Sequence, residues 1–292
     1  MELNLNVSES CNARCSFCIY RKTSGPKRVM SLKLYWKAID QYRKMGGKTL
    51  VLNPLTGEPL TDPYLFERTD KKALQGLEHV IMYTNGILLT KHDNISRLLA
   101  SGITQIYVSI GGFDKNLYTR VMGVDKYEEM MSGLKQLLMK NKELAKPKSI
   151  GFEIRGGIEN LLTDDFFREI MPIVDNGFVR DNIFISKLFD NWTGAITRED
   201  LEESWDFMPV GLVRLRPCRW TFDITVMADG VVRACGCRYG NLGVKDELIV
   251  GDLNHDDLQT IWDSEAVRRI RRSFTRMEQA NVCIRCRAYV AI

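Results

Sequence analysis

Long apolar runs are missing from this sequence. No stretch of about 18 uninterrupted apolar residues occurs, so we expect no segment that spans a bilayer. The first ten residues, MELNLNVSES, also lack the basic start, the long apolar run and the small-residue cleavage site of a signal peptide. These absences favour a protein of the cytoplasm, and we predict no membrane partner.

A strong charge of either sign is missing as well. The chain has 41 basic and 37 acidic residues, which leaves a net charge of +4. That excess is too small to predict binding to nucleic acid or to a membrane surface. Apolar residues make up 45% of the sequence and charged residues 27%, which is typical of a globular protein with a sizeable core.

Histidine is scarce, and cysteine is absent from residues 19–217. The three histidines, at 79, 92 and 255, open a strand, start a helix and lie in a turn of the expected elements, so none is a strong candidate base. In a reducing cytosol, clustered thiols more often bind metals or take part in redox chemistry than form disulfides. The eight cysteines therefore predict two separate metal sites, one at Cys11, Cys15 and Cys18, and the other among Cys218, Cys235, Cys237, Cys283 and Cys286.

Short apolar runs alternate with helical patterns through the first two thirds of the chain. Strands alternating with helices predict parallel βα units. About six units in some 190 residues predict an α/β fold that is a partial (β/α)6 TIM-like barrel, with its chemistry at the carboxyl ends of the strands. The expected strands are residues 2–7, 49–53, 79–84, 105–110, 149–155 and 182–187, and the expected helices are 32–45, one ending at 96–102, 114–121, 126–142 and one near 164–175.

The pattern changes after the expected sixth strand. Residues 222–235 are typical of a hairpin that turns at Asp229 and Gly230, and residues 258–274 are typical of a helix. We therefore divide the chain into a barrel core at 1–190, a connecting segment at 191–217 and a small C-terminal α+β subdomain at 218–292.

The expected C-terminal helix carries many arginines. Its other face is apolar, with Val267, Ile270 and Phe274. Such a pattern indicates a solvated helix face, or a face that receives an anionic substrate or an electron donor. The arginines are Arg268, Arg269, Arg271, Arg272 and Arg276.

The first three cysteines have the spacing C-x3-C-x2-C and follow the first expected strand directly. Three thiolates alone do not complete a tetrahedral zinc site, and His79 is the nearest histidine in sequence. Three thiolates on a four-iron cluster leave one iron open to bind another molecule. A zinc site completed by a distant residue is the alternative.

This triad, with Phe17 just before Cys18, resembles the cluster motif of the radical S-adenosylmethionine (SAM) superfamily. "LTGEP" at 55–59 and "YTNG" at 83–86 resemble further motifs of that family, in the family's order. The resemblance implies a [4Fe–4S] cluster whose open iron binds SAM, and cleavage of SAM to a 5′-deoxyadenosyl radical that takes a hydrogen atom from a substrate. It also implies an external electron donor of the flavodoxin or ferredoxin type.

The same resemblance implies SAM contacts at successive strand ends. Glu58 would bind the SAM ammonium, and Gly57 would let the backbone approach closely. Asn85 would lie near the ribose or support the site, while Ser109 would contact the ribose. Each residue could also have a purely structural role, as a turn glycine, an N-cap serine or a member of a surface ion pair. The remaining implied residues are Phe17, Thr56 and Arg155. Thr56 stands where the family's motif has its first glycine. The guanidinium of Arg155 suits the SAM carboxylate.

The C-terminal cysteines resemble the twitch subdomain, a shortened form of the SPASM extension of radical SAM enzymes. A cysteine precedes the hairpin, Gly230 lies at its turn, a cysteine follows five residues later, and "CIRC" supplies a distal pair. The resemblance implies a second [4Fe–4S] cluster with no open iron, whereas ligand chemistry alone would also allow a zinc ribbon. The implied ligands are Cys218, Cys235, Cys283 and Cys286.

Cys237 is left over, two residues after Cys235. It is a buried thiol, the true ligand in place of Cys235, or a hydrogen-atom donor. Some twitch-type epimerases place a cysteine beside a cluster ligand in this hairpin, where it quenches a substrate radical from the opposite face. Our leading hypothesis is an epimerase that acts on the carbinol carbon of a sugar or aminocyclitol-type small molecule, with Cys237 as the donor.

Three alternatives stay open. The first is a radical SAM dehydrogenase that oxidises the carbinol with the second cluster as electron acceptor. The second is a peptide-modifying maturase, which we disfavour because the triad begins at residue 11 and leaves no room for an N-terminal peptide-binding module. The third is a non-enzymatic zinc-binding protein. The substrate class rests on resemblance to enzymes of aminoglycoside biosynthesis, and Glu153, Lys187 and Asp190 are equally possible substrate contacts.

Overall fold

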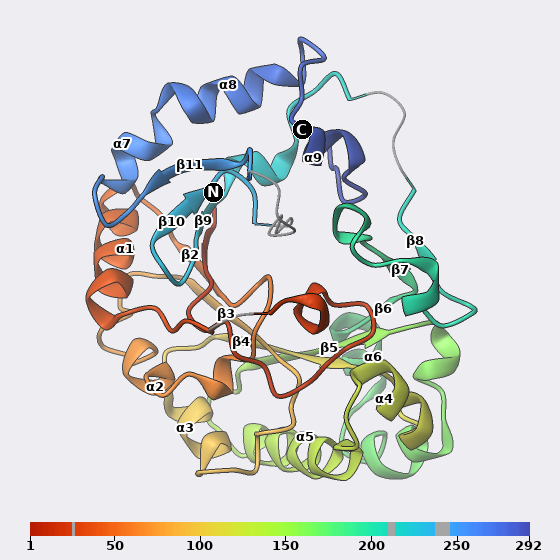
Figure 1. Ribbon diagram of the computed structural model, residues 1–292. Helices are drawn as coiled ribbons and strands as arrows, with labels where there is room; N and C mark the ends of the chain where they lie inside the picture. Colours follow the sequence, from red (N-terminus) through yellow and green to blue (C-terminus); the bar gives the residue numbers. More distant parts are fainter. Residues whose placement is uncertain (25–26, 210–213, 237–245) are drawn as a thin grey trace.

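A computed structural model describes residues 1–24, 27–209, 214–236 and 246–292 (Figure 1). Within these residues, nine strands form one open sheet in the order β11-β10-β9-β1-β2-β3-β4-β5-β6, and β7 pairs with β8 alone. The strands are β1 (Leu3–Leu5), β2 (Thr49–Leu52), β3 (His79–Thr84), β4 (Gln105–Ile110), β5 (Ser149–Arg155), β6 (Ile183–Ser186), β7 (Leu188–Phe189), β8 (Asp206–Phe207), β9 (Ile224–Val226), β10 (Val231–Arg233) and β11 (Ile249–Asp252).

Helices cover the outer face of the parallel strands in chain order, which makes the structure an incomplete barrel (Figure 1). Strands β1 to β6 all pair in parallel, as βα units require. The helices are α1 (Leu32–Lys44), α2 (Leu65–Arg68), α3 (Asn94–Ala100), α4 (Lys115–Met122), α5 (Tyr127–Lys142), α6 (Asn176–Asn182), α7 (Leu258–Trp262), α8 (Glu265–Ser273) and α9 (Asn281–Arg285).

The alternation of side chains along the central strands positions the site. On β4, Ile106, Val108 and Ile110 are fully buried in the core, whereas Tyr107 and Ser109 point to the opposite, inner side of the sheet. The six predicted strands are confirmed within two residues at each end, because each is a short apolar or β-branched run. The partial α/β barrel predicted from the sequence is confirmed as well.

The C-terminal hairpin continues the barrel sheet. Strand β9 pairs in parallel with β1, with Ile224 opposite Leu3, and β10 returns antiparallel to β9. Gly230 at the predicted turn has a φ of +96°, and a Cβ there would lie 2.2 Å from Nδ2 of Asn254. The hairpin therefore reaches the same strand that leads into the three cysteines.

Two predicted helices differ from the structure. The helix expected near 164–175 is a π-helical turn at Phe166–Ile170, because Pro172 has no N–H to continue an α-helix. The helix expected at 258–274 is divided into α7 and α8, since the Ser264 hydroxyl accepts from the N–H of Val267 and caps a new helix. Among the described residues, no helix is long and apolar enough to cross a membrane.

Candidate active site

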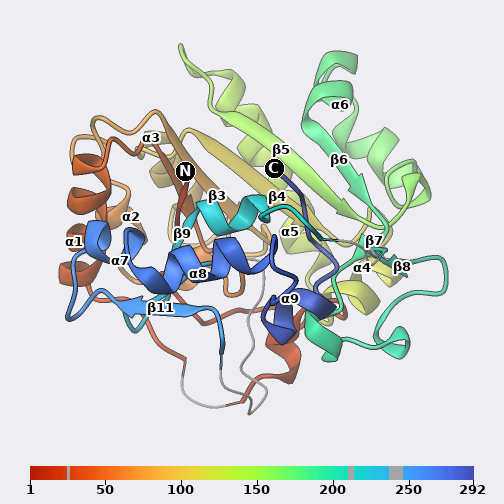
Figure 2. The ribbon, with the colours of Figure 1, turned by 90° about the horizontal axis from the view of Figure 1, so that it is seen from above.

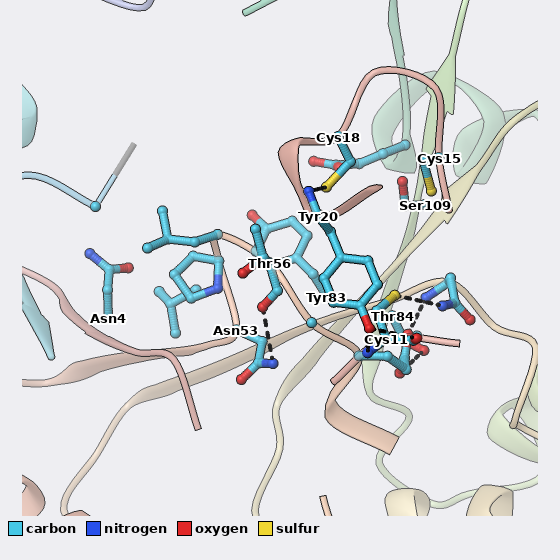
Figure 3. A pocket seen from close by; sticks show the side chains of 18 of the residues that line it. Asn4, Cys11, Cys15, Cys18, Tyr20, Asn53, Thr56, Tyr83, Thr84 and Ser109 are labelled. Atoms are coloured by element: carbon cyan, nitrogen blue, oxygen red, sulfur yellow. Dashed lines mark hydrogen bonds between the residues drawn. The ribbon is translucent and has the colours of Figure 1, made fainter. Parts of the chain in front are cut away.

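One cavity of about 530 Å³ lies at the carboxyl ends of the strands. Figure 3 shows three thiols directed into it, from Cys11, Cys15 and Cys18, with Ser109 close to Cys15. The structure thus brings together predicted site residues that are up to 144 positions apart in sequence, from Cys11 to Arg155. The predicted site residues that line this cavity are Cys11, Cys15, Phe17, Cys18, Thr56, Gly57, Glu58, Asn85, Ser109 and Arg155.

Tyr20, which the sequence did not single out, holds the cysteine loop from one side. Its hydroxyl accepts from the N–H of Cys11 at 3.1 Å and donates to the carbonyl of the same residue at 3.2 Å. The N–H of Tyr20 donates to Sγ of Cys18 at 3.4 Å. One aromatic residue therefore positions the first and the last thiol of the triad.

The end of α4 holds the other side of the cysteine loop. The N–H of Arg14 donates to the carbonyl of Met122 at 2.9 Å, and the N–H of Ser16 donates to that of Val121 at 2.8 Å. Gly123 ends the helix with a φ of +67°, and a Cβ there would lie 2.3 Å from the Arg14 carbonyl oxygen. Glycine at this position allows the helix end and the loop to touch.

Burial disfavours the charged thiolate form of the three cysteines. It raises the pKa of Cys11 to about 12, raises that of Cys15 well above its ordinary value and raises that of Cys18. The guanidinium of Arg155 opposes the rise for Cys15 and Cys18. Bound iron would supply the missing positive charge, so three soft ligands on one cavity wall fit an iron–sulfur cluster.

The described acidic, histidine and cysteine side chains do not form a single-ion site. Among the described residues, no three of these side chains form a group that could hold one metal ion. The ligands of a four-iron cluster stand further apart than those of one ion, because the cluster is larger.

Glu58 is a buried carboxylate at the cavity wall, only 1% exposed. It accepts from the hydroxyl of Thr84 at 2.8 Å and from the N–H groups of Asn85 and Leu60 at 2.7 and 3.1 Å. Burial nevertheless raises the pKa of Glu58 to about 7. Two carboxylate oxygens offer about four acceptor sites, so one remains for a cationic ligand in the cavity.

The loop that carries Glu58 is attached to the loop after β1. The N–H of Glu58 donates to the carbonyl of Ser10 at 2.7 Å. Gly57 has a φ of +91°, and a Cβ there would lie only 2.1 Å from the Ser8 carbonyl oxygen. The close approach predicted for Gly57 is thus an approach to the protein's own backbone.

Asn53 makes the same connection with its side chain, and only its place at a strand end could have indicated this role. Its Oδ1 accepts from the N–H groups of Val7 and Ser8 at 2.9 and 3.3 Å, and its Nδ2 donates to the Ser8 carbonyl at 2.7 Å. Asn53 is 4% exposed with a φ of +50°, a conformation that asparagine tolerates better than most residues.

Asn85 contacts the cysteine loop. Its Nδ2 donates to Oδ1 of Asn12 at 2.7 Å and lies 3.9 Å from Sγ of Cys11. Its Oδ1 accepts from the N–H of Ile87 at 3.1 Å. The sequence left open whether Asn85 lies near the SAM ribose or supports the site, and these contacts fit the supporting role.

Arg155 and Ser109 meet at the ends of β5 and β4. Nε of Arg155 donates to Oγ of Ser109 at 3.0 Å, and the guanidinium is also paired with the carboxylate of Glu153. The guanidinium carbon lies 5.4 Å from the ring centroid of Phe17. These contacts hold a positive charge beside the thiols. Of the suggested substrate contacts, Glu153 lines the cavity, whereas Lys187 and Asp190 are not among its described lining residues.

The second group of thiols gathers in the C-terminal part of the chain, with Cys283 on α9 and Cys286 directly after it. Cys218, Cys235 and Cys286 are buried, and Cys283 is half-buried. Burial raises the pKa of Cys283 to about 12, and the other three thiols add to the rise because they lie close to it. The four predicted ligands are thus neighbours, and their thiols fit a second cluster. Cys237 lies outside the described residues.

The C-terminal segment also forms part of the cavity wall. Arg219, Trp220, Asp223 and Gly236 line the same cavity as the first three thiols, as do Glu2 and Asn4 of the N-terminal strand. The sequence did not predict these six residues as site residues. The pairing of β9 with β1 brings them there, and no local pattern shows that pairing.

The site defines a protein of the radical SAM type, and comparison with known families agrees. The family model of the radical SAM superfamily matches residues 5–144, and that of the SPASM iron–sulfur cluster-binding domain matches residues 218–287. The chain belongs to the radical SAM superfamily and carries a C-terminal iron–sulfur domain. The cofactors of such a protein are [4Fe–4S] clusters and SAM.

Known proteins resemble parts or all of the chain. The GTP 3′,8-cyclase of Actinobacillus succinogenes is 25% identical over 136 residues, which are 45% of this chain and 39% of that protein. The chain thus spans less than half the length of such curated relatives. The structure of BtrN in complex with AdoMet and 2-DOIA has a TM-score of 0.60 at 15% identity, over 98% of this chain and 92% of BtrN. That of Streptococcus suis SuiB bound to its precursor peptide SuiA has a TM-score of 0.65 at 16% identity, over 94% of this chain and 66% of SuiB. At these identities, the two structures establish the fold.

Proposed function

We propose that this radical SAM enzyme acts on the carbinol carbon of a sugar- or aminocyclitol-type small molecule and inverts that carbon, with Cys237 as the hydrogen-atom donor. The observation that carries the proposal is the shared cavity. The three N-terminal thiols line it together with Gly236, the residue that precedes Cys237 in the sequence. A volume of about 530 Å³ lies within the range of small-molecule sites. The likeness to BtrN, whose structure holds AdoMet and 2-DOIA, also supports a small substrate.

The proposed roles follow from the charges around the cavity. When bound, the cluster and SAM supply, at the expense of one electron, a 5′-deoxyadenosyl radical that takes a hydrogen atom from the substrate carbon. Glu58 accepts a hydrogen bond from the SAM ammonium, and Arg155 donates to its carboxylate. Cys11, Cys15 and Cys18 hold the first cluster, and Cys218, Cys235, Cys283 and Cys286 hold the second.

The inversion step needs a thiol on the other face of the substrate. Cys237 gives the hydrogen atom of its Sγ to the carbon, which completes the C–H bond in the inverted configuration. The sulfur is then one hydrogen atom short. One electron from the external donor and one proton from solvent restore the thiol, so a turnover uses two electrons and one proton.

Replacement of Cys237 by alanine tests this function. In D2O, with 2-deoxystreptamine and glucosamine as probe substrates, the wild type is expected to place one deuterium on an inverted carbon, because the S–H proton exchanges with solvent. Cys237→Ala is expected to keep SAM cleavage and its iron but to form no inverted product. Mass spectrometry and NMR of the product check both results. An oxidised product without deuterium would contradict epimerisation and favour a dehydrogenase.

SAM binding should depend on pH through Glu58. Because burial raises the pKa of the Glu58 carboxyl to about 7, the carboxyl takes up a proton below that pH and loses its attraction for the ammonium. The Kd of SAM is expected to rise up to about tenfold per pH unit below 7. Calorimetric titration from pH 8 to pH 6 measures this. The isosteric Glu58→Gln variant should bind weakly throughout, and an equal pH dependence in that variant would contradict the role of Glu58.

A further inference from the structure

Helix α8 presents a basic face directly above the second group of thiols. On its inner side, Ile270 belongs to the small core that contains Cys235, and Cys283 packs against that core. On its outer side, four arginines are exposed along α8 and the turn that follows it. We call these residues the α8 face, and they are Arg268, Arg269, Arg272 and Arg276.

The charge of this face is largely uncompensated. Residues 264–292 contain seven arginines and two glutamates, in a chain whose net charge is only +4. Glu265 is paired with both Arg268 and Arg272. Arg269 and Arg276 make no ion pair with any described residue. A positive potential therefore extends from this face into solvent.

An apolar area borders the arginines. The side chain of Met277 is 74% exposed, and that of Ile284 on α9, next to Cys283, is 53% exposed. Exposed apolar side chains beside a ring of like charges are a common composition of a protein-binding surface. In Figures 1 and 2, α8 and α9 lie next to each other at the same end of the molecule.

Arg271 has a different position, although it shares the helix. Its guanidinium carbon lies 4.0 Å from the ring centroid of Trp262 and 4.5 Å from that of Phe222, and its Nε donates to the carbonyl of Thr221 at 3.0 Å. Arg271 thus fixes α8 to the cavity-forming segment, whereas the four arginines of the α8 face are exposed. The helix is therefore a rigid platform for the exposed charges.

We propose that the α8 face is the docking site of the external electron donor, an acidic protein of the flavodoxin class. The donor's negative surface is complementary to the arginines, and Met277 and Ile284 supply the apolar contact. Cys283, the most exposed described thiol of the second group, precedes Ile284 in the sequence, so docking there brings the donor's flavin to the side of the molecule that holds this group. The donor gives up one electron for each cleavage of SAM, and in an inverting turnover it gives up a second electron that restores the Cys237 thiol. The inference rests on the family's need for an electron, and not on the choice between epimerisation and oxidation.

The test measures binding directly, with the reconstituted holoenzyme and an oxidised acidic flavodoxin. Arg269→Glu/Arg276→Glu is expected to raise the Kd at low salt at least about tenfold, because two attractive charges become repulsive. The wild-type Kd should rise with ionic strength, and the variant should lose most of that dependence. The control is Lys91→Glu/Lys140→Glu, with the same change in charge on exposed residues near α3 and on α5, at the opposite side of the barrel (Figure 1).

A second measurement separates docking from folding and from chemistry. SAM cleavage driven by dithionite, which needs no docking site, should be equal in the wild type and in the Arg269→Glu/Arg276→Glu variant. Cleavage driven by reduced flavodoxin should fall at least about tenfold in that variant only. Equal flavodoxin binding in the variant and the wild type, the same loss in the lysine control, or no binding of flavodoxin to the wild type would overturn the proposal. None of these results depends on the identity of the substrate.

Discussion

Cys11→Ala is expected to abolish SAM cleavage while leaving about four of about eight irons per chain. Cys11 belongs to the group of three buried thiols, and its loss leaves two, too few to hold a cluster with an open iron. The second group should keep its own iron, since Cys235 belongs to a separate small core against which Cys283 packs. Iron analysis and chromatographic detection of 5′-deoxyadenosine check both expectations.

Cys218→Ala is the matched control for that experiment. It should also leave about four irons, but these irons belong to the first group, so SAM cleavage should continue. The two variants should thus contain equal amounts of iron, but only Cys218→Ala should cleave SAM. Circular dichroism verifies that each variant is folded. SAM cleavage by Cys11→Ala at the wild-type rate, or its loss in Cys218→Ala alone, would contradict the assignment of the two groups.

Gly57→Ala is expected to reduce SAM cleavage about 100-fold, because a methyl group there forces the Glu58 loop away from the loop after β1. Its Cβ would lie 2.1 Å from the carbonyl oxygen of Ser8, which is backbone and does not yield as a flexible side chain does. The displacement would also weaken the hydrogen bond from the N–H of Glu58 to Ser10. We expect a higher Kd for SAM together with an unchanged iron content.

Gly46→Ala provides a control with the same backbone strain. Gly46 has a φ of +78°, close to the +91° of Gly57, but nothing lies within 4 Å of the position of its added Cβ. Both substitutions should destabilise the fold by about 1–2 kcal/mol through the left-handed conformation. Only Gly57→Ala should impair SAM cleavage. Equal activity of the two variants would show that the contact between the two loops does not position Glu58.

The parallel strands could be predicted from the sequence because each carries its own local signal. Strands β3, β4 and β5 begin and end at the predicted residues, since apolar and β-branched runs between turn residues mark them clearly. Strand β11 has only four residues, with a glycine and an aspartate among them, and gave no such signal. The break between α7 and α8 at Asp263 depends on the helix cap at Ser264, and the end of the helical turn before Pro172 depends on the missing N–H of that proline. The periodicity of apolar residues shows neither break.

The sequence predicted those residues of the candidate site that lie in a recognisable motif. Cys11, Cys15, Cys18, Gly57, Glu58 and Asn85 lie in short motifs, and the structure places these six residues at one cavity. Tyr20 and Asn53 act through hydrogen bonds to backbone atoms of a neighbouring loop, so their contribution depends on tertiary contacts. Likewise, Trp220 and Asp223 reach the cavity only because β9 pairs with β1. Such long-range pairing leaves no trace in local composition.

The content of iron and acid-labile sulfide in anaerobically reconstituted wild type and Cys237→Ala tests the central claim most directly. Two four-iron clusters predict about eight irons and about eight sulfides per chain in both proteins. A fall to about four irons in Cys237→Ala would make Cys237 a ligand and contradict its role as the hydrogen donor. A wild type that holds zinc and no sulfide would contradict the assignment of both thiol groups to iron–sulfur clusters.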